Sequence, residues 1–565
     1  MIDIKRKEIY FYSLLIISII LKFIFLDQDL PSQRLTEYNE YDQFWYTQPV
    51  RSWILHYYCL LQGFDYPRIM FDLFQNFWTY PFLKIFGNNF YGFKIPTVIL
   101  SIFIIYFLIN ILKEKNKRLS KVSMILILLI SFDFMFNITS RVQNPCIYSL
   151  FGISFIFYLM KIFIETKNQN LKNYMSFLLG FFSIFLVFLI YIFNFFILAS
   201  IFSFFLFGFL YSKKISLKEI SLFLTGIFFG FIFYNLTTFL FFLKTFFDLI
   251  FSLRNFGGGD EFRVVKQLDI SFSKKIKKHI GSIFLLSFFK LNLFYIPIIF
   301  GGLFVTFKNL LKKERLATFI LLCLIFVNIQ NWFEPHYISK KMIVLLPIFL
   351  ILSKYSIEFI IHFKNENRKN KIGFLFFLFV GFIGSIYNYK MTTSYWYNEL
   401  WFGDNMSHIF NFLNFSLLFI ITILLFFYSY YKNELLIFTL VVLSLLPSSF
   451  MIYSEILTNR SYNCKKSLIE LHNIIDDNNV YNGNNFTLYN NFTCSGSSLH
   501  FIDITEDDDF IFNEIDYLLL ISDSINNLKS QKKAISLKEK DVNPLFFYKS
   551  LYFNQGKYLN IFKKK

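Results

Sequence analysis

Long apolar runs separated by short polar segments dominate the first 453 residues of the chain. A helix needs roughly 20 apolar residues to cross a bilayer, and about 13 runs approach that length. They lie near 10–26, 92–112, 122–138, 146–164, 175–191, 193–211, 219–238, 288–307, 316–330, 342–361, 372–388, 409–428 and 434–453. Almost nothing polar divides 175–211, which predicts two spans or a re-entrant hairpin followed by one span. The pattern predicts a polytopic α-helical membrane protein.

Composition supports this prediction and excludes other classes. Of the 565 residues, 55% are hydrophobic, 84 are Phe, and only 17% are charged, whereas soluble domains carry about 25% charged residues. Mean hydropathy is +0.48. These values exclude a soluble enzyme, a disordered chain and a fibrous repeat.

The net charge of +18 is concentrated in short basic clusters between the apolar runs. Such clusters mark cytoplasmic loops. They occur within 5–7, 113–121, 213–218, 308–315 and 364–371. Placing all of them inside gives a consistent alternation only if 175–211 crosses twice or not at all. The segments 27–91, 239–287, 389–408 and the chain from about 454 then lie outside. The first run lacks a small-residue cleavage site, so we expect it to remain as an anchor.

The composition changes after residue 454, which divides the chain into a membrane domain, 1–454, and a tail, 455–565. In the tail, Lys465–Ile475 predicts an amphipathic helix, and Phe486–Tyr489, Tyr517–Ile521 and Tyr558–Ile561 predict strands. We expect a small extracytoplasmic α/β domain. Cys464 and Cys494 could pair there only in an oxidising compartment.

Candidate chemistry collects in the first outer loop. Its acids are Asp27, Asp29, Glu37, Glu40, Asp42, Asp65 and Asp72, set among many aromatic residues. A carboxylate just above the bilayer is partly desolvated, which can raise its pKa and suit it to act as a general base. An ordinary solvated loop is the alternative. The predicted spans carry few charges, Asp133 being an exception, which favours chemistry at the outer surface over transport.

An ordered set of short motifs follows the first span. These are Asp27-Gln28-Asp29-Leu30-Pro31, Tyr41-Asp42-Gln43-Phe44-Trp45-Tyr46, Val50-Arg51, Asp65-Tyr66-Pro67, Ile85-Phe86-Gly87-Asn88, Lys94-Ile95-Pro96, Ser140-Arg141-Val142-Gln143-Asn144-Pro145 and Pro335-His336-Tyr337. The set resembles the polyprenyl-phosphate-dependent glycosyltransferases of the GT-C superfamily. Within it, the resemblance is greatest to the protein O-mannosyltransferase and lipid A aminoarabinose transferase group. It implies a GT-C-like membrane domain.

The resemblance also implies roles for residues. Asp42 becomes the catalytic base, which takes the proton of an acceptor hydroxyl while that oxygen displaces a lipid phosphate from the sugar. Three further acids are candidates for sugar contacts or a helper acid: Glu40, Asp65 and Asp72. Candidates for binding the lipid phosphate, or for the substrate contacts around it, are Arg51, Arg68, Arg141, Arg263, His336, Tyr337 and Lys340.

The implied partners are a polyprenyl-phosphate sugar donor, an acceptor that is a lipid, glycan or protein, and membrane lipids, but no nucleic acid. No metal site or cofactor is expected, since the seven His show no ligand spacing; Asp27-Gln28-Asp29 leaves a divalent metal open. We expect the chain in the bacterial inner membrane with its tail periplasmic. The alternatives are a transporter or flippase of lipid-linked saccharides and a structural member of an envelope complex.

Overall fold

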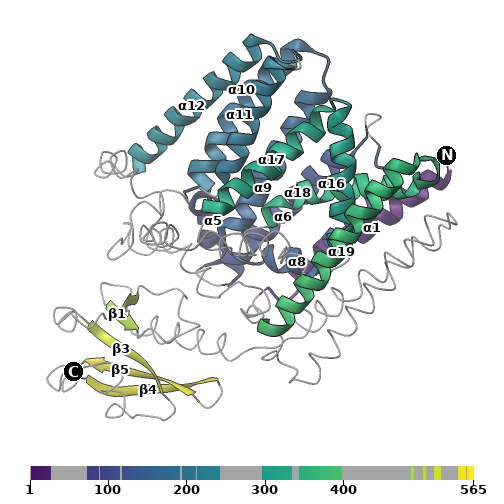
Figure 1. The fold of residues 1–565 in the computed structure, drawn as a ribbon. Coiled ribbons are helices and arrows are strands. Elements are labelled where there is room, and N and C mark those ends of the chain that lie inside the picture. The colour runs from purple at the N-terminus through teal and green to yellow at the C-terminus, as the bar shows by residue number, and fades with distance from the viewer. Residues whose placement is uncertain are drawn as a thin grey trace.

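The computed structural model describes residues 2–26, 73–87, 90–114, 118–190, 194–211, 213–241, 295–333 and 343–396, together with five strands of the tail. Its helices in the first half of the chain are α1 (Ile2–Phe23), α5 (Leu73–Phe86), α6 (Phe90–Leu112), α7 (Lys121–Ser131), α8 (Phe134–Thr139), α9 (Pro145–Glu165), α10 (Gln169–Phe185), α11 (Phe195–Leu210) and α12 (Leu217–Phe241). Then come α16 (Tyr295–Leu311), α17 (Arg315–Phe333), α18 (Leu346–Ile361) and α19 (Arg368–Trp396). Figure 1 shows these helices gathered into one bundle.

Most predicted spans within the described residues are helical. Five stretches are long and apolar enough to cross a membrane by length and composition: Tyr91–Leu112, Pro145–Glu165, Gln169–Ile190, Leu217–Leu236 and Ile343–Ile361. Shorter apolar helices include Phe195–Leu210 and Arg315–Gln330. The predicted runs at 409–428 and 434–453 lie outside the described residues. The described helices are thus long and apolar enough for several spans, but they do not test the expected number of about 13.

Two predicted boundaries were wrong. The run 122–138 is not one helix, because Asp133 adopts an extended backbone and its side chain accepts a hydrogen bond from Phe136 N, which starts α8. The second boundary is that of the run 372–388, which continues as α19 to Trp396 and so takes in the start of the predicted outer segment 389–408.

The basic loops meet at one end of the bundle, as the charge pattern predicted. Arg315 donates to the carbonyl of Lys214 at 3.3 Å, and Lys214 donates to the carbonyl of Lys313 at 3.4 Å. Elsewhere at this end, Lys308 forms an ion pair with Glu366 at 2.7 Å. We call this the inner end and the opposite one the outer end.

The uncertain run 175–211 forms two antiparallel helices. At the start of α10, Gln169 donates to Glu219 at the start of α12, and the chain leaving α11 reaches the same inner end through Lys214. Between them, α10 continues into a π-helix at Leu186–Ile190, and Asn194 donates to the carbonyl of Leu186 at 3.1 Å. The run therefore passes through the bundle twice, which is one of the two arrangements that the alternation of basic clusters allows.

Phenylalanine side chains and close glycine contacts pack the bundle. A single large apolar core joins residues of α1, α6, α7, α9, α11, α17 and α18. The rings of Phe205 and Phe223 stack with their centroids 4.7 Å apart. Small residues let helices approach closely in a bilayer, and glycines occur where α10 and α12 lie side by side (Figure 1).

The tail contains a five-stranded mixed sheet. Its strands are β1 (Asn485–Leu488), β2 (Phe501–Asp503), β3 (Ile515–Ser522), β4 (Leu545–Asn554) and β5 (Lys557–Lys564). They are ordered β2-β1-β3-β5-β4, with β1 parallel to β2 and β3 and with β5 antiparallel to β3 and β4. The three predicted strands coincide with β1, β3 and β5. The predicted helix 465–475 lies outside the described residues, so the α/β domain stays a prediction.

Candidate functional site

Of the residues predicted to act on substrates, Arg141 alone lies within the described residues. The others lie outside them: Glu40, Asp42, Arg51, Asp65, Arg68, Asp72, Arg263, His336, Tyr337 and Lys340. The structure does describe the helices on either side of the acid-rich segment 27–72. The segment follows the end of α1 and precedes α5.

A buried turn at the outer end links α8 to α9, and its sequence explains why it forms. Asn144 caps α9 by accepting a hydrogen bond from Cys146 N, and Pro145 occupies the first turn, where its missing N–H costs nothing. On the other side, α8 ends at Thr139. We call residues 140–144 the α8–α9 turn. All five of its residues are buried.

Arg141 of this turn holds the end of α1. Its side chain is only 5% exposed. The guanidinium donates from Nε to the carbonyl of Lys22 at 3.2 Å and from one terminal nitrogen to the carbonyl of Ile24. The last carbonyls of a helix lack partners within the helix, and a cation next to them is favoured by the helix dipole. Arg141 therefore caps α1, and its predicted contact with a lipid phosphate stays a prediction.

The side chain of Lys22, at the end of α1, contacts α8 and the α8–α9 turn. This side chain is fully buried and donates from Nζ to Asn137 Oδ1 at 3.0 Å and to Ser140 Oγ at 3.4 Å. The ammonium also lies 4.2 Å from the centre of the Phe136 ring, a cation–π contact. The end of α1 is thus fixed to α8 through both its backbone and its side chain.

Gln143, two residues after Arg141, holds the other flank of the segment. Its amide donates to Phe93 O at 2.7 Å and to Thr79 Oγ1 at 3.1 Å. Its carbonyl oxygen accepts from Tyr148 OH at 2.8 Å and from Gln75 Nε2 at 3.4 Å. Both donors and both acceptor positions of the amide are therefore used. Because Gln75 and Thr79 lie one turn apart in α5, the network fixes α5 to α9.

Sequence reasoning missed most of this polar network. It identified Arg141 as a candidate, but not Lys22, Gln75, Gln143 or Tyr148. Two signals were available: a lysine inside an apolar run, and a glutamine and a threonine spaced four residues apart within the outer segment 27–91. Neither signal names a partner, since the partners are 64 to 115 residues away in the sequence.

The described groups at the outer end can bind and orient other groups through hydrogen bonds. This end supplies amides, hydroxyls and the cations of Lys22, Lys94 and Arg141, and the carboxylate of Asp133 caps α8. In the part of the chain that the structure describes, no group of three or more His, Cys, Asp or Glu could hold a metal ion. The acids predicted to act on substrates all lie outside the described residues.

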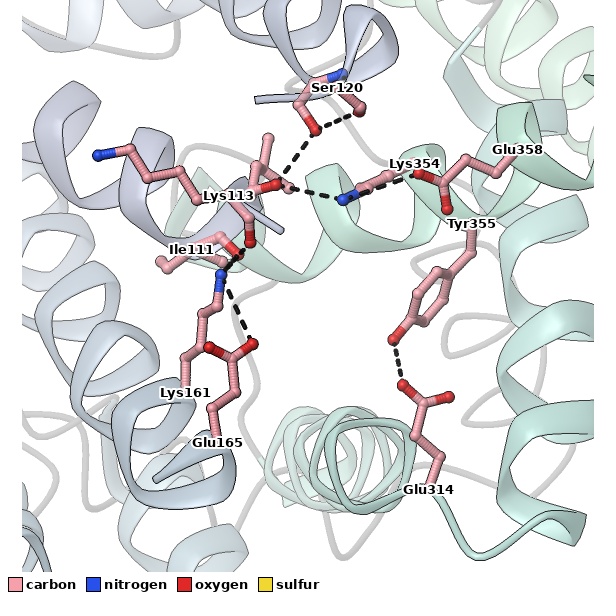
Figure 2. Close-up of polar contacts among 11 residues, drawn as sticks. Ile111, Lys113, Ser120, Lys161, Glu165, Glu314, Lys354, Tyr355 and Glu358 are labelled. Carbon is pink, nitrogen blue, oxygen red and sulfur yellow. Dashed lines mark hydrogen bonds and ion pairs between the residues drawn. The ribbon is translucent and has the colours of Figure 1, made fainter. Parts of the chain in front are cut away.

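A second charged cluster lies at the inner end, around a cavity of about 470 Å³. Lys161 of α9 donates to the carbonyls of Asn110 and Ile111 at 3.0 Å each and to that of Lys113, and Lys354 of α18 donates to the carbonyl of Leu112 at 3.2 Å. Figure 2 shows both lysines pointing toward the end of α6. These bonds cap α6, so we assign the cluster to the framework.

Neither a protein-family model nor a curated protein matches the sequence. Solved structures do. ArnT from Cupriavidus metallidurans in the apo state matches with a TM-score of 0.56 at 8% identity, over 99% of this chain and 98% of that chain. ArnT bound to undecaprenyl phosphate matches with a TM-score of 0.58 at 8% identity, over 98% and 97%.

An oligosaccharyltransferase from Archaeoglobus fulgidus, in complex with Zn and sulfate, matches at 15% identity over 67% of this chain and 52% of that chain. Its TM-score of 0.41 is too low to support an argument about fold. The likeness to ArnT, in contrast, extends from one end of the chain to the other. The chain therefore shares the overall fold of ArnT, a likeness that the sequence motifs predicted.

Proposed function

We propose that the protein is a membrane glycosyltransferase, which moves a sugar from a polyprenyl-phosphate donor to an acceptor on the outer side of the membrane. The observation that carries this proposal is the end-to-end likeness to ArnT, including a form of ArnT that binds undecaprenyl phosphate. The acceptor is a lipid, a glycan or a protein, and it would be presented at the outer end.

The proposed reaction is a direct displacement at the anomeric carbon. The acceptor oxygen forms the new bond to this carbon as the bond to the phosphate oxygen breaks, and the phosphate leaves with the electron pair. Asp42 takes the proton that the acceptor hydroxyl loses. Such a displacement inverts the anomeric configuration. Glu40, Asp65 and Asp72 would contact the sugar or assist Asp42.

The departing phosphate needs cations close to the outer surface. Arg51, Arg68, Arg263, His336 and Lys340 are proposed for this role, with Tyr337 beside them. No resident cofactor is proposed, because a lipid phosphate is already a good leaving group once its charge is balanced. Transfer that survives a chelator of divalent metals would support this choice, and loss of transfer that added metal restores would overturn it.

The same proposal places the protein in the bacterial inner membrane, with the segment 27–72 and the tail on the periplasmic side. The basic loops at the inner end support this orientation, since cytoplasmic loops are enriched in Lys and Arg. The tail would then lie where the acceptor is presented, at the same surface as the segment that carries Asp42.

Purified protein in lipid nanodiscs, supplied with a polyprenyl-phosphate sugar and candidate acceptors, tests the proposal. The wild type should form product, and Asp42→Asn should lower the rate on the order of 10²- to 10⁴-fold, the usual contribution of a general base. The matched control is Glu37→Gln, an acid of the same segment with no proposed role, which should keep the wild-type rate. Full activity of Asp42→Asn would remove the mechanism, and donor movement across a bilayer without transfer would favour a flippase.

A further inference from the structure

The α8–α9 turn contacts both flanks of the segment that carries Asp42. We propose that Arg141 and Gln143 are positioning residues: together they hold the end of α1 and the start of α5 in one fixed arrangement, and so place the segment 27–72. This inference rests on the proposed function for its catalytic consequence, but its structural part stands without it. Neither residue needs to touch the substrate.

The two side chains act on opposite flanks although they lie two residues apart. Arg141 reaches back to the backbone of α1 at Lys22 and Ile24. Gln143 reaches α5 through Thr79 and Gln75. A shift of the turn would therefore displace both flanks at once, and the segment between them has no other entry or exit along the chain.

Burial makes these contacts rigid. Gln143 is fully buried and Arg141 nearly so, and a buried polar group that loses its partner carries a large desolvation penalty. Both ends of the turn are themselves fixed, because Ser140 accepts from Lys22 and Asn144 caps α9. The amide of Gln143, whose donors and acceptor positions are all used, favours one arrangement of the backbone around it.

Positioning matters in a displacement reaction because reacting atoms must meet at about 3 Å, and a misplacement of 1 Å can lower a rate on the order of 10²-fold. The turn would thus contribute to catalysis from outside the site.

Hydrogen exchange with mass spectrometry on full-length protein in nanodiscs tests the structural part. Arg141→Lys should raise the exchange of residues 22–26, and Gln143→Met should raise that of residues 73–80, each by tenfold or more, about the loss of one buried bond. The matched control is Lys161→Gln, which removes a cation from carbonyls at the inner end. It should raise exchange only near residues 110–113.

Transfer assays on the same variants test the catalytic part. Arg141→Lys and Gln143→Met should lower kcat on the order of 10²-fold, with little change in the KM for the donor, and Lys161→Gln should keep the wild-type kcat per folded molecule. A raised donor KM without increased exchange at 22–26 would show that Arg141 is a phosphate ligand instead. Unchanged exchange at both flanks would overturn the proposal.

Failure of the proposed function would give a different result. A wild type that transfers no sugar, but whose flanks loosen in the two variants as predicted, would refute the glycosyltransferase and leave the turn as the structural link. Loosened flanks with unchanged kcat would remove the positioning role while leaving the proposed function intact. Should Gln143→Met prevent folding, Tyr148→Phe removes one hydrogen bond to Gln143 and tests the α5 flank. Should Arg141→Lys prevent folding, Ser140→Ala removes one hydrogen bond from Lys22 and tests the α1 flank.

Discussion

Replacing Gly226 with Ala should separate α10 from α12. Gly226 faces α10, where an added Cβ would lie 3.0 Å from both the carbonyl carbon of Phe177 and the amide nitrogen of Phe181, and closer still to the carbonyl oxygen of Phe177. An ordinary contact needs 3.4 Å or more. Because the obstructing atoms are backbone, the whole helix must move. Gly180 has the reciprocal contact, with the backbone of α12 at Phe223.

The magnitude follows from two opposing terms. Overpacking of this kind costs about 1–3 kcal/mol, whereas Ala gains about 1 kcal/mol over Gly in helix propensity. We therefore expect Gly226→Ala to destabilise the protein by up to about 2 kcal/mol. At Gly152 the neighbouring atoms are side-chain atoms of Leu186 and Ile190, which can rotate away, so Gly152→Ala should be neutral or stabilising.

Thermal unfolding in the same detergent, followed for both variants, measures the difference. The Tm of Gly226→Ala should fall below that of the wild type, and the Tm of Gly152→Ala should not. A Gly226→Ala variant as stable as Gly152→Ala would refute the close backbone contact between α10 and α12, and with it the helix arrangement at this side of the bundle.

Two further predictions concern pH and orientation. The hydrogen bond from Lys308 lowers the pKa of Glu366. The pair should therefore stabilise the protein above about pH 4.3, the pKa of Glu in the unfolded chain, and this stabilisation should be lost as the pH falls through the lowered pKa. The Tm difference between wild type and Glu366→Gln should vanish in acid, and a difference that grew there would contradict the pairing. Orientation can be tested by thiol labelling in a protein whose native cysteines have been replaced. Ser32→Cys should react with a membrane-impermeant thiol reagent in intact cells, whereas Lys214→Cys should react only after the cells are permeabilised. The reverse pattern would place the acid-rich segment in the cytosol.

Much of the helical framework could be predicted from sequence because each span is encoded locally. A run of apolar residues has no stable alternative to a helix in a bilayer, and basic clusters set its direction. These rules also required 175–211 to cross twice or not at all, and the structure places two antiparallel helices there, α10 and α11. The strands β1, β3 and β5 were likewise visible as short apolar runs between turn residues.

The framework of the outer end could not be predicted, because its interactions join distant parts of the chain. In sequence, Lys22 resembles a lysine that extends its side chain toward the membrane surface. In the structure it is buried beside Asn137 of α8. Asp133 likewise looked like a charge within a span, whereas its local role is to cap α8. Only the packing of α1 against α7 and α8 distinguishes these outcomes.

Arg141 shows the same limit for function. An arginine in a motif at the outer surface favours a phosphate ligand, since Arg binds phosphate well. In the structure its guanidinium donates to the carbonyls of Lys22 and Ile24 at the end of α1, and its contact with a phosphate stays a prediction. The acids were identified from motif order alone, and Asp42, the residue on which the proposed chemistry depends, lies outside the described residues.

The most direct test of the proposed chemistry follows both products of one reaction. Wild-type protein in nanodiscs, given a radiolabelled polyprenyl-phosphate sugar and acceptor, should release one polyprenyl phosphate for each sugar transferred, with the anomeric configuration inverted. Asp42→Asn should bind the donor as tightly as the wild type and release almost none. Equal release by the two proteins, or transfer with retained configuration, would contradict a displacement in which Asp42 is the base.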